Sequence, residues 1–236
     1  MQSPATNNTI IALNDVCVAY GARQQLALDH ASLSIAQGDF VAITGPNGGG
    51  KTTTLRVILQ LLKPTSGSVA FYRDGRQVQH LEMGYLPQKN MIDSRFPVTV
   101  AEVVAMGLPA IMKPLHRITA QERDLIDSML ETVGMADKRN SPIGSLSGGQ
   151  LQRTLLGRAM ISSPEVLVLD EPLSYIDKAF EHHLYGIIER VSHSSTIILV
   201  SHEMSVISGM ANRHIIIDKT LHECHAAHHY QQSECQ

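Results

Sequence analysis

A glycine-rich turn between a strand-like run and a helix-like run constrains the fold of this chain more than any other feature. Residues 45–52 read Gly-Pro-Asn-Gly-Gly-Gly-Lys-Thr, after the apolar run 40–44 and before the helical pattern 52–62. They fit the pattern G-x-x-x-x-G-K-[ST] in the context that it requires. The glycines let backbone N–H groups curl around phosphate oxygens, and the following helix directs its positive end at the same anion. The pattern therefore predicts a phosphate-binding loop.

Two side chains at the start of the predicted helix would carry the chemistry of this loop. Lys51 is expected to hold the β- and γ-phosphates of a nucleotide, and the hydroxyl of Thr52 is expected to bind Mg²⁺. The alternative is an ordinary glycine-rich turn, which needs neither the strand before it nor the helix after it. The flanking segments favour the phosphate-binding interpretation.

Short runs rich in β-branched residues alternate with longer helical patterns along the rest of the chain. This alternation predicts a mainly parallel sheet with helices on both faces, which is a three-layer α/β core. The predicted strands are 10–18, 40–44, 68–72, 166–170, 196–201 and 214–218, and the predicted core helices are 52–62, 150–161 and 178–191.

The middle of the chain, at about 89–163, lacks strand-like runs, and helical spacing takes over at 99–106 and 119–133. We interpret it as an inserted helical subdomain, with a loop at Pro109 and Pro114 between the two helices. The whole α/β domain is expected to span residues 8–218. A short tail rich in His, Gln and Cys, residues 219–236, would follow it.

Composition limits the possible classes of protein. At 236 residues the chain can bury one large core without disulfides, and its net charge of -3 argues against nucleic acid as a partner. Its three cysteines, Cys17, Cys224 and Cys235, are too scattered for a disulfide framework and fit a reducing cytoplasm. Cys17 lies in an apolar run and is expected in the core. Because no run reaches the ~18 apolar residues of a membrane span, we expect a soluble chain that reaches a membrane through a partner.

An apolar run that ends in two acids supplies a second candidate site. Residues 166–172 read Val-Leu-Val-Leu-Asp-Glu-Pro, so the predicted strand brings both carboxylates to the carboxyl edge of the sheet, beside the phosphate loop. Asp170 could reach Mg²⁺ there, and Glu171 could reach the attacking water. Such a pair is also a common helix cap, but the phosphate loop upstream favours the catalytic interpretation.

Residues 146–153, Leu-Ser-Gly-Gly-Gln-Leu-Gln-Arg, predict a helix start with Ser147 as its cap. A phosphate loop, then LSGGQ, then a hydrophobic strand ending in Asp-Glu-Pro resembles the ATP-binding-cassette family over about residues 8–218. The resemblance implies a P-loop NTPase fold, ATP and Mg²⁺ as cofactors, and two copies that pack head to tail. Ser147, Gly148 and Gly149 of one copy would then bind the γ-phosphate of ATP held by the other.

The resemblance also gives roles to four isolated residues. Tyr20 matches the aromatic ring that lies against adenine, and Gln88 matches the glutamine that links Mg²⁺ and the attacking water to the helical subdomain. Asp177 matches the aspartate that crosses the dimer interface, although Tyr175 is not the residue most familiar beside it. His202 matches the histidine that contacts the γ-phosphate. Without the family, these would be a strand-end tyrosine, a solvated loop glutamine and two unremarkable polar residues.

The implied reaction is hydrolysis of ATP by a water that Glu171 polarises, with phosphate release reopening the dimer. Gly49 stands where alanine is frequent in the family, and Thr52 stands where serine is frequent; both keep the required backbone freedom and hydroxyl. The residues of the loop expected to contact the nucleotide are Gly45, Pro46, Asn47, Gly48, Gly49, Gly50, Lys51, Thr52 and Thr53.

Within the family, a cassette without a fused membrane segment resembles the ATPase subunits of bacterial importers. The stretches 85–89, 96–104 and 142–150 are similar to the zinc and manganese importers, although 96–100 can also be interpreted as a simple helix approach. The resemblance implies separate transmembrane permease subunits, an indirect link to a substrate-binding protein, and a peripheral location at the cytoplasmic face of the membrane. An importer of iron chelate or cobalamin, or a soluble ABC ATPase that transports nothing, are the alternatives.

The tail offers imidazole and thiolate groups, a ligand set that suits Zn²⁺. We consider two hypotheses: a tail that senses or buffers zinc, and a frayed terminus that binds metal only as an expression tag does. If the tail is helical, its first, third and fifth members share a face. These members are His222, Cys224, His225, His228 and His229, with Cys235 further along.

Overall fold

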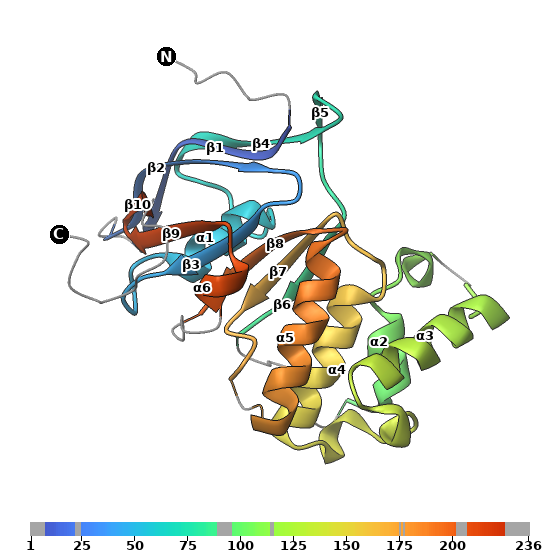
Figure 1. Ribbon diagram of the computed structural model, residues 1–236. Helices are drawn as coiled ribbons and strands as arrows, with labels where there is room; N and C mark the ends of the chain where they lie inside the picture. The colour runs from blue at the N-terminus through green and yellow to red at the C-terminus, as the bar shows by residue number, and fades with distance from the viewer. Residues whose placement is uncertain are drawn as a thin grey trace. The chain divides into compact units, whose positions relative to one another are not determined.

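The computed structural model describes residues 8–21, 25–88, 96–113, 116–174, 176, 178–201 and 207–224. The chain, drawn in Figure 1, divides into two compact units. Unit 1 combines Met1–Leu81 with Thr196–Gln236, and unit 2 is Glu82–Ser195. No helix within these described ranges has both the length and the apolar character that a membrane span requires.

Unit 1 contains an antiparallel sheet in the order β2-β1-β4-β5. Its strands are β1 (Thr9–Tyr20), β2 (Gln25–Ala36), β4 (Ser66–Arg73) and β5 (Arg76–Val78). In β2 the buried side chains Leu28, Ala31, Leu33 and Ile35 are interrupted by exposed polar ones. This half-buried alternation is typical of an antiparallel strand with one wet face, and β2 was absent from the predicted strands because its run is not continuously apolar.

The register between β1 and β2 shifts at four places, two of which lie around Cys17. Leu13 pairs with Leu33 and Val16 with Ala31, so two residues of β1 oppose one of β2. Two residues further along β1, Val18 pairs with Leu28. Cys17, between Val16 and Val18, therefore faces the two residues Asp29 and His30 of β2. These are β-bulges, which leave an extra residue on one strand and re-aim its side chain.

Unit 1 also contains the strands that flank the glycine-rich loop, in the order β10-β9-β3-β8. β3 (Phe40–Thr44) pairs parallel with β8 (Thr196–Val200) and with β9 (Arg213–Asp218), and β10 (Thr220–Cys224) pairs antiparallel with β9. The helices α1 (Lys51–Ile58) and α6 (Ile207–Met210) belong to this unit. All five residues of β8 are buried, as expected for a strand with both faces covered.

The segment assigned to the tail, from 219 onward, begins with the strand β10. Arg213 of β9 holds it: its guanidinium donates to Glu223 Oε1 at 2.6 Å and to Asp39 Oδ2 at 2.8 Å. These hydrogen bonds raise the pKa of Arg213 above its ordinary value, and the bond with Glu223 has the largest effect. His222 therefore lies in a strand and shares no helical face, while residues 225–236, which hold the rest of the tail ligands, are outside the described residues.

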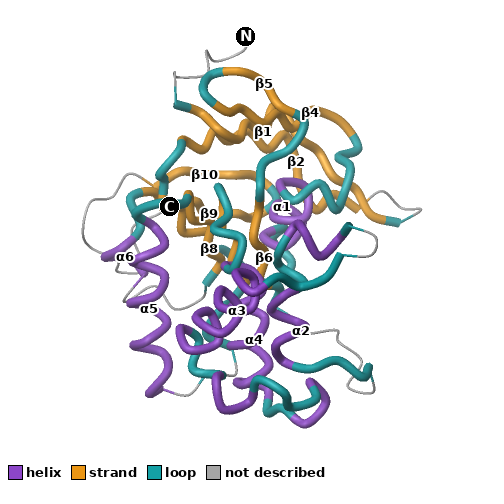
Figure 2. The backbone as a smooth tube through the Cα atoms, turned by 90° about the vertical axis from the view of Figure 1, so that its right-hand side faces the viewer, coloured by secondary structure: helices purple, strands orange, loops and turns teal. Residues whose placement is uncertain are grey.

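Unit 2 contains the parallel pair β6 (Met83–Leu86) and β7 (Val166–Asp170) and all the predicted helices except that at 52–62. Its α-helices are α2 (Val100–Ala105), α3 (Ala120–Thr132), α4 (Gly148–Met160) and α5 (Lys178–Ser192), and its short 3-10 turns are η1 (Pro109–Met112), η2 (Ala136–Lys138) and η3 (Ile143–Ser145). α2, α3 and α4 pack against one another (Figure 2). Each of these three helices begins with a complete capping box, at Thr99, Thr119 and Ser147, so their starts are locally encoded.

The α/β fold class predicted from the sequence is confirmed, and all six predicted strands are present. Residues 40–44 and 166–170 form strands with the expected bounds.

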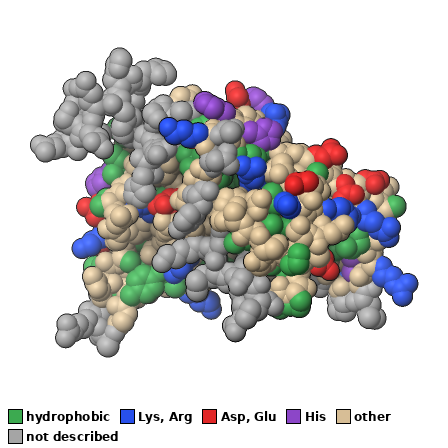
Figure 3. Space-filling model, turned by 90° about the horizontal axis from the view of Figure 1, so that it is seen from below, with side chains coloured by type: hydrophobic (Ala, Val, Ile, Leu, Met, Phe, Trp, Pro, Cys, Tyr) green, Lys and Arg blue, Asp and Glu red, His purple; other side chains and the backbone are tan. Residues whose placement is uncertain are grey.

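On the face in Figure 3 the described basic and acidic side chains are interspersed, a mixture in keeping with a net charge of -3.

Two glycines of unit 2 allow backbones to touch. A Cβ on Gly84 in β6 would collide with the carbonyl oxygen of Ala159, and one on Gly107 would collide with that of Arg158. Both partners belong to α4, so this helix lies directly on the backbone of β6 and on the end of α2. Gly186 of α5 has nothing within 4 Å of its added Cβ.

We expect Gly84→Ala to destabilise the protein by about 1–3 kcal/mol, because the added methyl overpacks the contact with α4. Gly186→Ala is the matched control and should stabilise by roughly 0.5–1 kcal/mol through helix propensity. Urea unfolding of both variants measures the two values. Equal effects in the two variants would contradict the close packing at Gly84.

Candidate functional site

The glycine-rich loop leaves β3 at Thr44 and enters α1 at Lys51, as the motif predicts. Gly45, Gly48 and Gly50 have φ of 139°, 79° and 105°, a region that side chains with a Cβ rarely adopt. A Cβ on Gly45 would collide with the carbonyl of Ile217 in β9, and one on Gly50 with that of Ala27 in β2. The base of the loop is thus pressed against two strands of unit 1.

The outer part of the loop faces solvent. Pro46, Asn47 and Gly48 are exposed, whereas Gly49 and Gly50 are buried. A Cβ on Gly49 would come within 2.7 Å of the Ile217 carbonyl and 3.0 Å of the Pro46 carbonyl. An alanine at position 49 would therefore require the loop to shift.

Lys51 is folded back over this loop. The residue is only 7% exposed. Its ammonium donates to the carbonyl of Gly45 at 2.8 Å and to that of Pro46 at 3.0 Å. A cation held at this point favours an anion at the loop, as do the N–H groups at the start of a helix. Thr52 is half-buried beside it and Thr53 is buried.

Tyr20 lies at the end of β1 with 41% of its surface exposed. Its hydroxyl is 3.4 Å from the hydroxyl of Thr53, the third residue of α1. The ring is therefore tethered close to the phosphate loop while part of it stays open to solvent. An exposed aromatic ring at this place could stack on a planar base.

In unit 2, the two acids that the sequence singled out lie at the end of β7, with Asp170 as its last residue and Glu171 directly after it. Asp170 is 1% exposed, and Glu171 is half-buried with a φ of 50°. A residue with a Cβ in this left-handed region is strained, and such strain concentrates at functional sites. Ser174 supports the turn, because its hydroxyl lies 3.5 Å from Glu171 Oε2 and its N–H donates to the Glu171 carbonyl at 3.1 Å.

The start of α4 has the geometry expected of the LSGGQ segment. Ser147 Oγ accepts from the Gln150 N–H at 3.3 Å, and Gln150 Oε1 accepts from the Ser147 N–H at 3.0 Å. Ser147 and Gly148 are exposed, and Gly149 is half-buried. The first turn of the helix is thus fixed in shape and open to solvent.

Sequence reasoning missed Gln152, which joins α4 to the turn after β7. Its side chain is fully buried, and its amide donates to the carbonyl of Pro172 at 3.4 Å. Pro172 follows Glu171 directly, so this bond connects the LSGGQ helix with the strained acid. A glutamine on the apolar side of a helical pattern was the available signal.

The remaining predicted residues have less structural context. Gln88 is half-buried, two residues beyond the end of β6. Asp177 and His202 lie outside the described residues, as does Tyr175. The described residues with a predicted role toward Mg²⁺ are Thr52, Gln88 and Asp170, and each offers oxygen. Oxygen donors are the set that Mg²⁺ prefers, so these side chains fit the ion.

Comparison with known proteins adds family information. A family model described as "ABC transporter" matches residues 28–174. A Chlamydia trachomatis protein named "Probable metal transport system ATP-binding protein" is 38% identical, over 89% of this chain and 88% of its own length. The "Zinc import ATP-binding protein" of Pseudomonas savastanoi is 35% identical over 94% and 76% of the two chains. A high-affinity zinc uptake system ATP-binding protein of Bacillus subtilis is 33% identical over 89% and 91%.

Solved structures with the same fold include dimeric cassettes. A bacterial ABC transporter cassette, solved as a dimer, superposes with a TM-score of 0.76 at 26% identity, over 92% of this chain and 100% of the other. A dimeric ATP-binding cassette in a post-hydrolysis state, bound to ADP and Pi, gives a TM-score of 0.78 at 24% identity over the same shares.

Replacing Gln152 with methionine keeps the side-chain volume but removes the donor to the Pro172 carbonyl. We expect Gln152→Met to cost about 1–3 kcal/mol of stability, the range for a buried group that loses its partner. Chemical denaturation provides the measurement, with Gln121→Met at an exposed position of α3 as comparison. No loss of stability in Gln152→Met would show that the bond is not important for the turn.

Proposed function

The chain belongs to the ABC transporter family, and on that premise we propose that it is the ATP-hydrolysing subunit of a bacterial importer for a divalent metal ion, with zinc as its cargo. The observation that carries the ATPase part is the loop at Gly45–Lys51, where a buried ammonium spans two loop carbonyls. Relatives named for zinc uptake, similar over most of their length, support the cargo.

ATP binds at the phosphate loop in this proposal. The γ- and β-phosphates draw the Lys51 ammonium from the carbonyls of Gly45 and Pro46, while loop N–H groups contact the phosphate oxygens. Adenine lies against the exposed ring of Tyr20, where stacking needs no particular base. The buried glycines keep the loop in place, because their backbone is packed against β2 and β9.

Thr52, Asp170 and Gln88 would hold Mg²⁺ through their oxygen atoms. When bound, the ion neutralises the charge that develops on the phosphates. The protein groups do the rest: Glu171, aimed by its left-handed backbone, orients the attacking water and accepts its proton. We assign His202 to the γ-phosphate, in keeping with the family pattern.

Two copies of the chain would close around the nucleotide. Ser147, Gly148 and Gly149 present the N-terminal turn of α4 to solvent, and a helix start of this kind attracts phosphate. The γ-phosphate bound by one copy therefore meets this turn of the other copy, with Asp177 at the interface. Separate transmembrane permease subunits recruit the dimer to the cytoplasmic face of the membrane, and a substrate-binding protein delivers the cargo to them.

Replacing the proposed base with its amide tests the catalytic assignment. Glu171→Gln should keep ATP binding, because the loop is untouched, but slow hydrolysis by roughly 10²–10⁴-fold. With ATP present, size-exclusion chromatography with light scattering should detect a trapped dimer. Glu189→Gln, an exposed change on α5, is the control. Unaltered steady-state hydrolysis in Glu171→Gln would remove this residue from its role.

The cargo is tested in cells that carry the cognate permease and either the intact chain or Glu171→Gln. We expect uptake of radioactive zinc to depend on Glu171. Uptake of radioactive manganese and iron is measured in parallel. Zinc uptake that is equal in the two strains would contradict the proposed cargo. Dependence of iron uptake alone would assign the ATPase to a different importer.

A further inference from the structure

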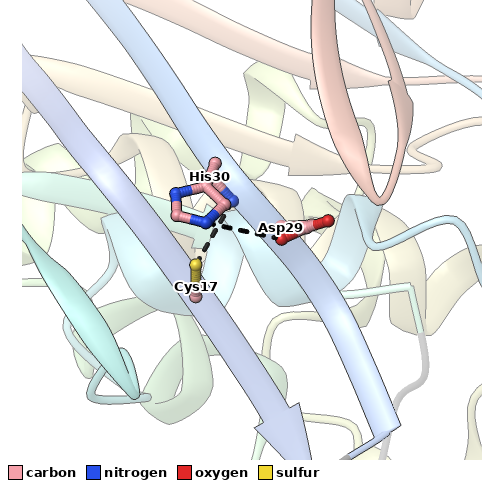
Figure 4. A group of neighbouring side chains, drawn as sticks. All are labelled: Cys17, Asp29 and His30. Atoms are coloured by element: carbon pink, nitrogen blue, oxygen red, sulfur yellow. Dashed lines mark hydrogen bonds and ion pairs between the residues drawn. The ribbon is translucent and has the colours of Figure 1, made fainter.

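Three side chains with metal-binding atoms meet where β1 and β2 are irregular, and the proposed ATPase mechanism uses none of them. They are Cys17, Asp29 and His30 (Figure 4). One ligand atom of each, the thiol sulfur, a carboxylate oxygen and a ring nitrogen, lies within 4.8 Å of the others. A thiol, an imidazole and a carboxylate are all protein ligands of Zn²⁺.

The bulge creates this group. Because Val16 faces Ala31 and Val18 faces Leu28, Cys17 stands opposite both Asp29 and His30. His30 has a φ of 48°, and its backbone N–H donates to Cys17 Sγ at 3.3 Å. In a regular ladder only one residue would face Cys17, so the bulge is what brings two further ligands to the thiol.

A fourth residue orients the imidazole. Asp15 Oδ1 lies 2.7 Å from His30 Nδ1, so this carboxylate can accept a hydrogen bond from the Nδ1–H of the neutral ring. With Nδ1 carrying the proton, Nε2 has the lone pair, and Nε2 is 4.0 Å from Asp29 Oδ1. A carboxylate that fixes the tautomer of a histidine in this way is a regular companion of metal-binding imidazoles.

The chemistry of the group favours Zn²⁺ over harder ions. Mg²⁺ and Ca²⁺ prefer oxygen alone, whereas a thiolate selects softer metals. Tetrahedral zinc with bonds of about 2.0–2.3 Å separates its ligand atoms by roughly 3.3–3.6 Å. The ligand atoms, which lie within 4.8 Å of one another, must move closer together to reach this spacing. His30 and Asp29, with 71% and 45% of their side chains exposed, have room for that rotation.

We propose that Cys17, Asp29 and His30 bind one Zn²⁺ ion, with water as the fourth ligand. Binding forms a zinc–sulfur bond, and the thiol proton leaves to solvent. Cys17 is buried, so the ion enters from the side of Asp29 and His30. The site shares no residue with the proposed Mg²⁺ ligands.

The site is linked to the phosphate loop by two backbone hydrogen bonds. The N–H of Asp29 donates to the Lys219 carbonyl at 2.8 Å, and the N–H of Lys219 donates to the Gly49 carbonyl at 2.7 Å. A shift of Asp29 on binding zinc is therefore transmitted to the loop that holds ATP. In a zinc importer, and so resting on the proposed function, this arrangement lets the delivered ion regulate the nucleotide affinity of the ATPase.

The binding test uses the full chain with Cys224→Ser and Cys235→Ser, which leaves Cys17 as the sole thiol. Titration with Co²⁺ should produce a thiolate-to-cobalt charge-transfer band that saturates at one ion per chain and disappears when Zn²⁺ is added. Only Cys17 can give this band, so histidines elsewhere in the chain cannot imitate it. Absence of the band would overturn the proposal.

Substitutions in the same background identify the other ligands. His30→Gln should weaken Co²⁺ binding at least about tenfold, and Asp15→Asn should weaken it less, as expected of an orienting partner. His193→Gln, at an exposed histidine in unit 2, should leave it unchanged. His30 is largely exposed, so its variant should fold, and an unchanged affinity in His30→Gln would contradict the site.

The link to the loop is tested by measuring Mg·ATP affinity with and without saturating Zn²⁺. We expect a change of at least about fivefold, the scale of a modest coupling between two sites, and its loss in His30→Gln. This variant also controls for zinc bound directly by the nucleotide. The same affinity with and without zinc would overturn the coupling, whereas no ATP binding under either condition would instead contradict the proposed function.

Discussion

The position of the glycine-rich loop in unit 1 depends on close contact between its backbone and the backbone of neighbouring strands. Gly45 and Gly50 lie against the carbonyls of Ile217 and Ala27, and these contacts seat the loop on β9 and β2 at once. The buried ammonium of Lys51 then closes the loop through two carbonyls. Because interiors are close-packed, a single added methyl here would displace strand, loop and helix together.

The sequence predicted those parts of the fold whose signals are local. The phosphate loop, the apolar strands at 40–44 and 166–170 and the capped start of α4 each depend on a few neighbouring residues. β2 was missed because a wet-faced strand has no continuous apolar run, and β10 was missed because its support is Arg213, seven residues before it begins. The bulges depend on the register between two strands, and no single segment encodes that register.

The residues of the candidate site also fall into those with a local sequence signal and those that depend on distant partners. Lys51 and Ser147 were singled out by their motifs, and Tyr20 by the family resemblance. The structure gives their hydrogen-bond partners, and their roles toward a nucleotide stay predictions. Gln152 was missed although its place on the apolar side of a helical pattern was a signal, and the group around Cys17 had no signal in the sequence, because its members are brought together by the pairing of two strands. Cys17 was expected only in the core, and it is indeed buried, yet burial did not reveal the aspartate and histidine that a two-against-one pairing brings to its sulfur.

The left-handed backbone of Glu171 has a consequence for evolution and engineering. For a residue with a Cβ this conformation costs roughly 1–2 kcal/mol, which glycine would largely recover. Selection for thermal tolerance alone would therefore favour glycine at position 171. On the role that we propose for Glu171, a cassette with glycine at this position would bind nucleotide without turning it over, so stability and turnover make opposite demands on one backbone position.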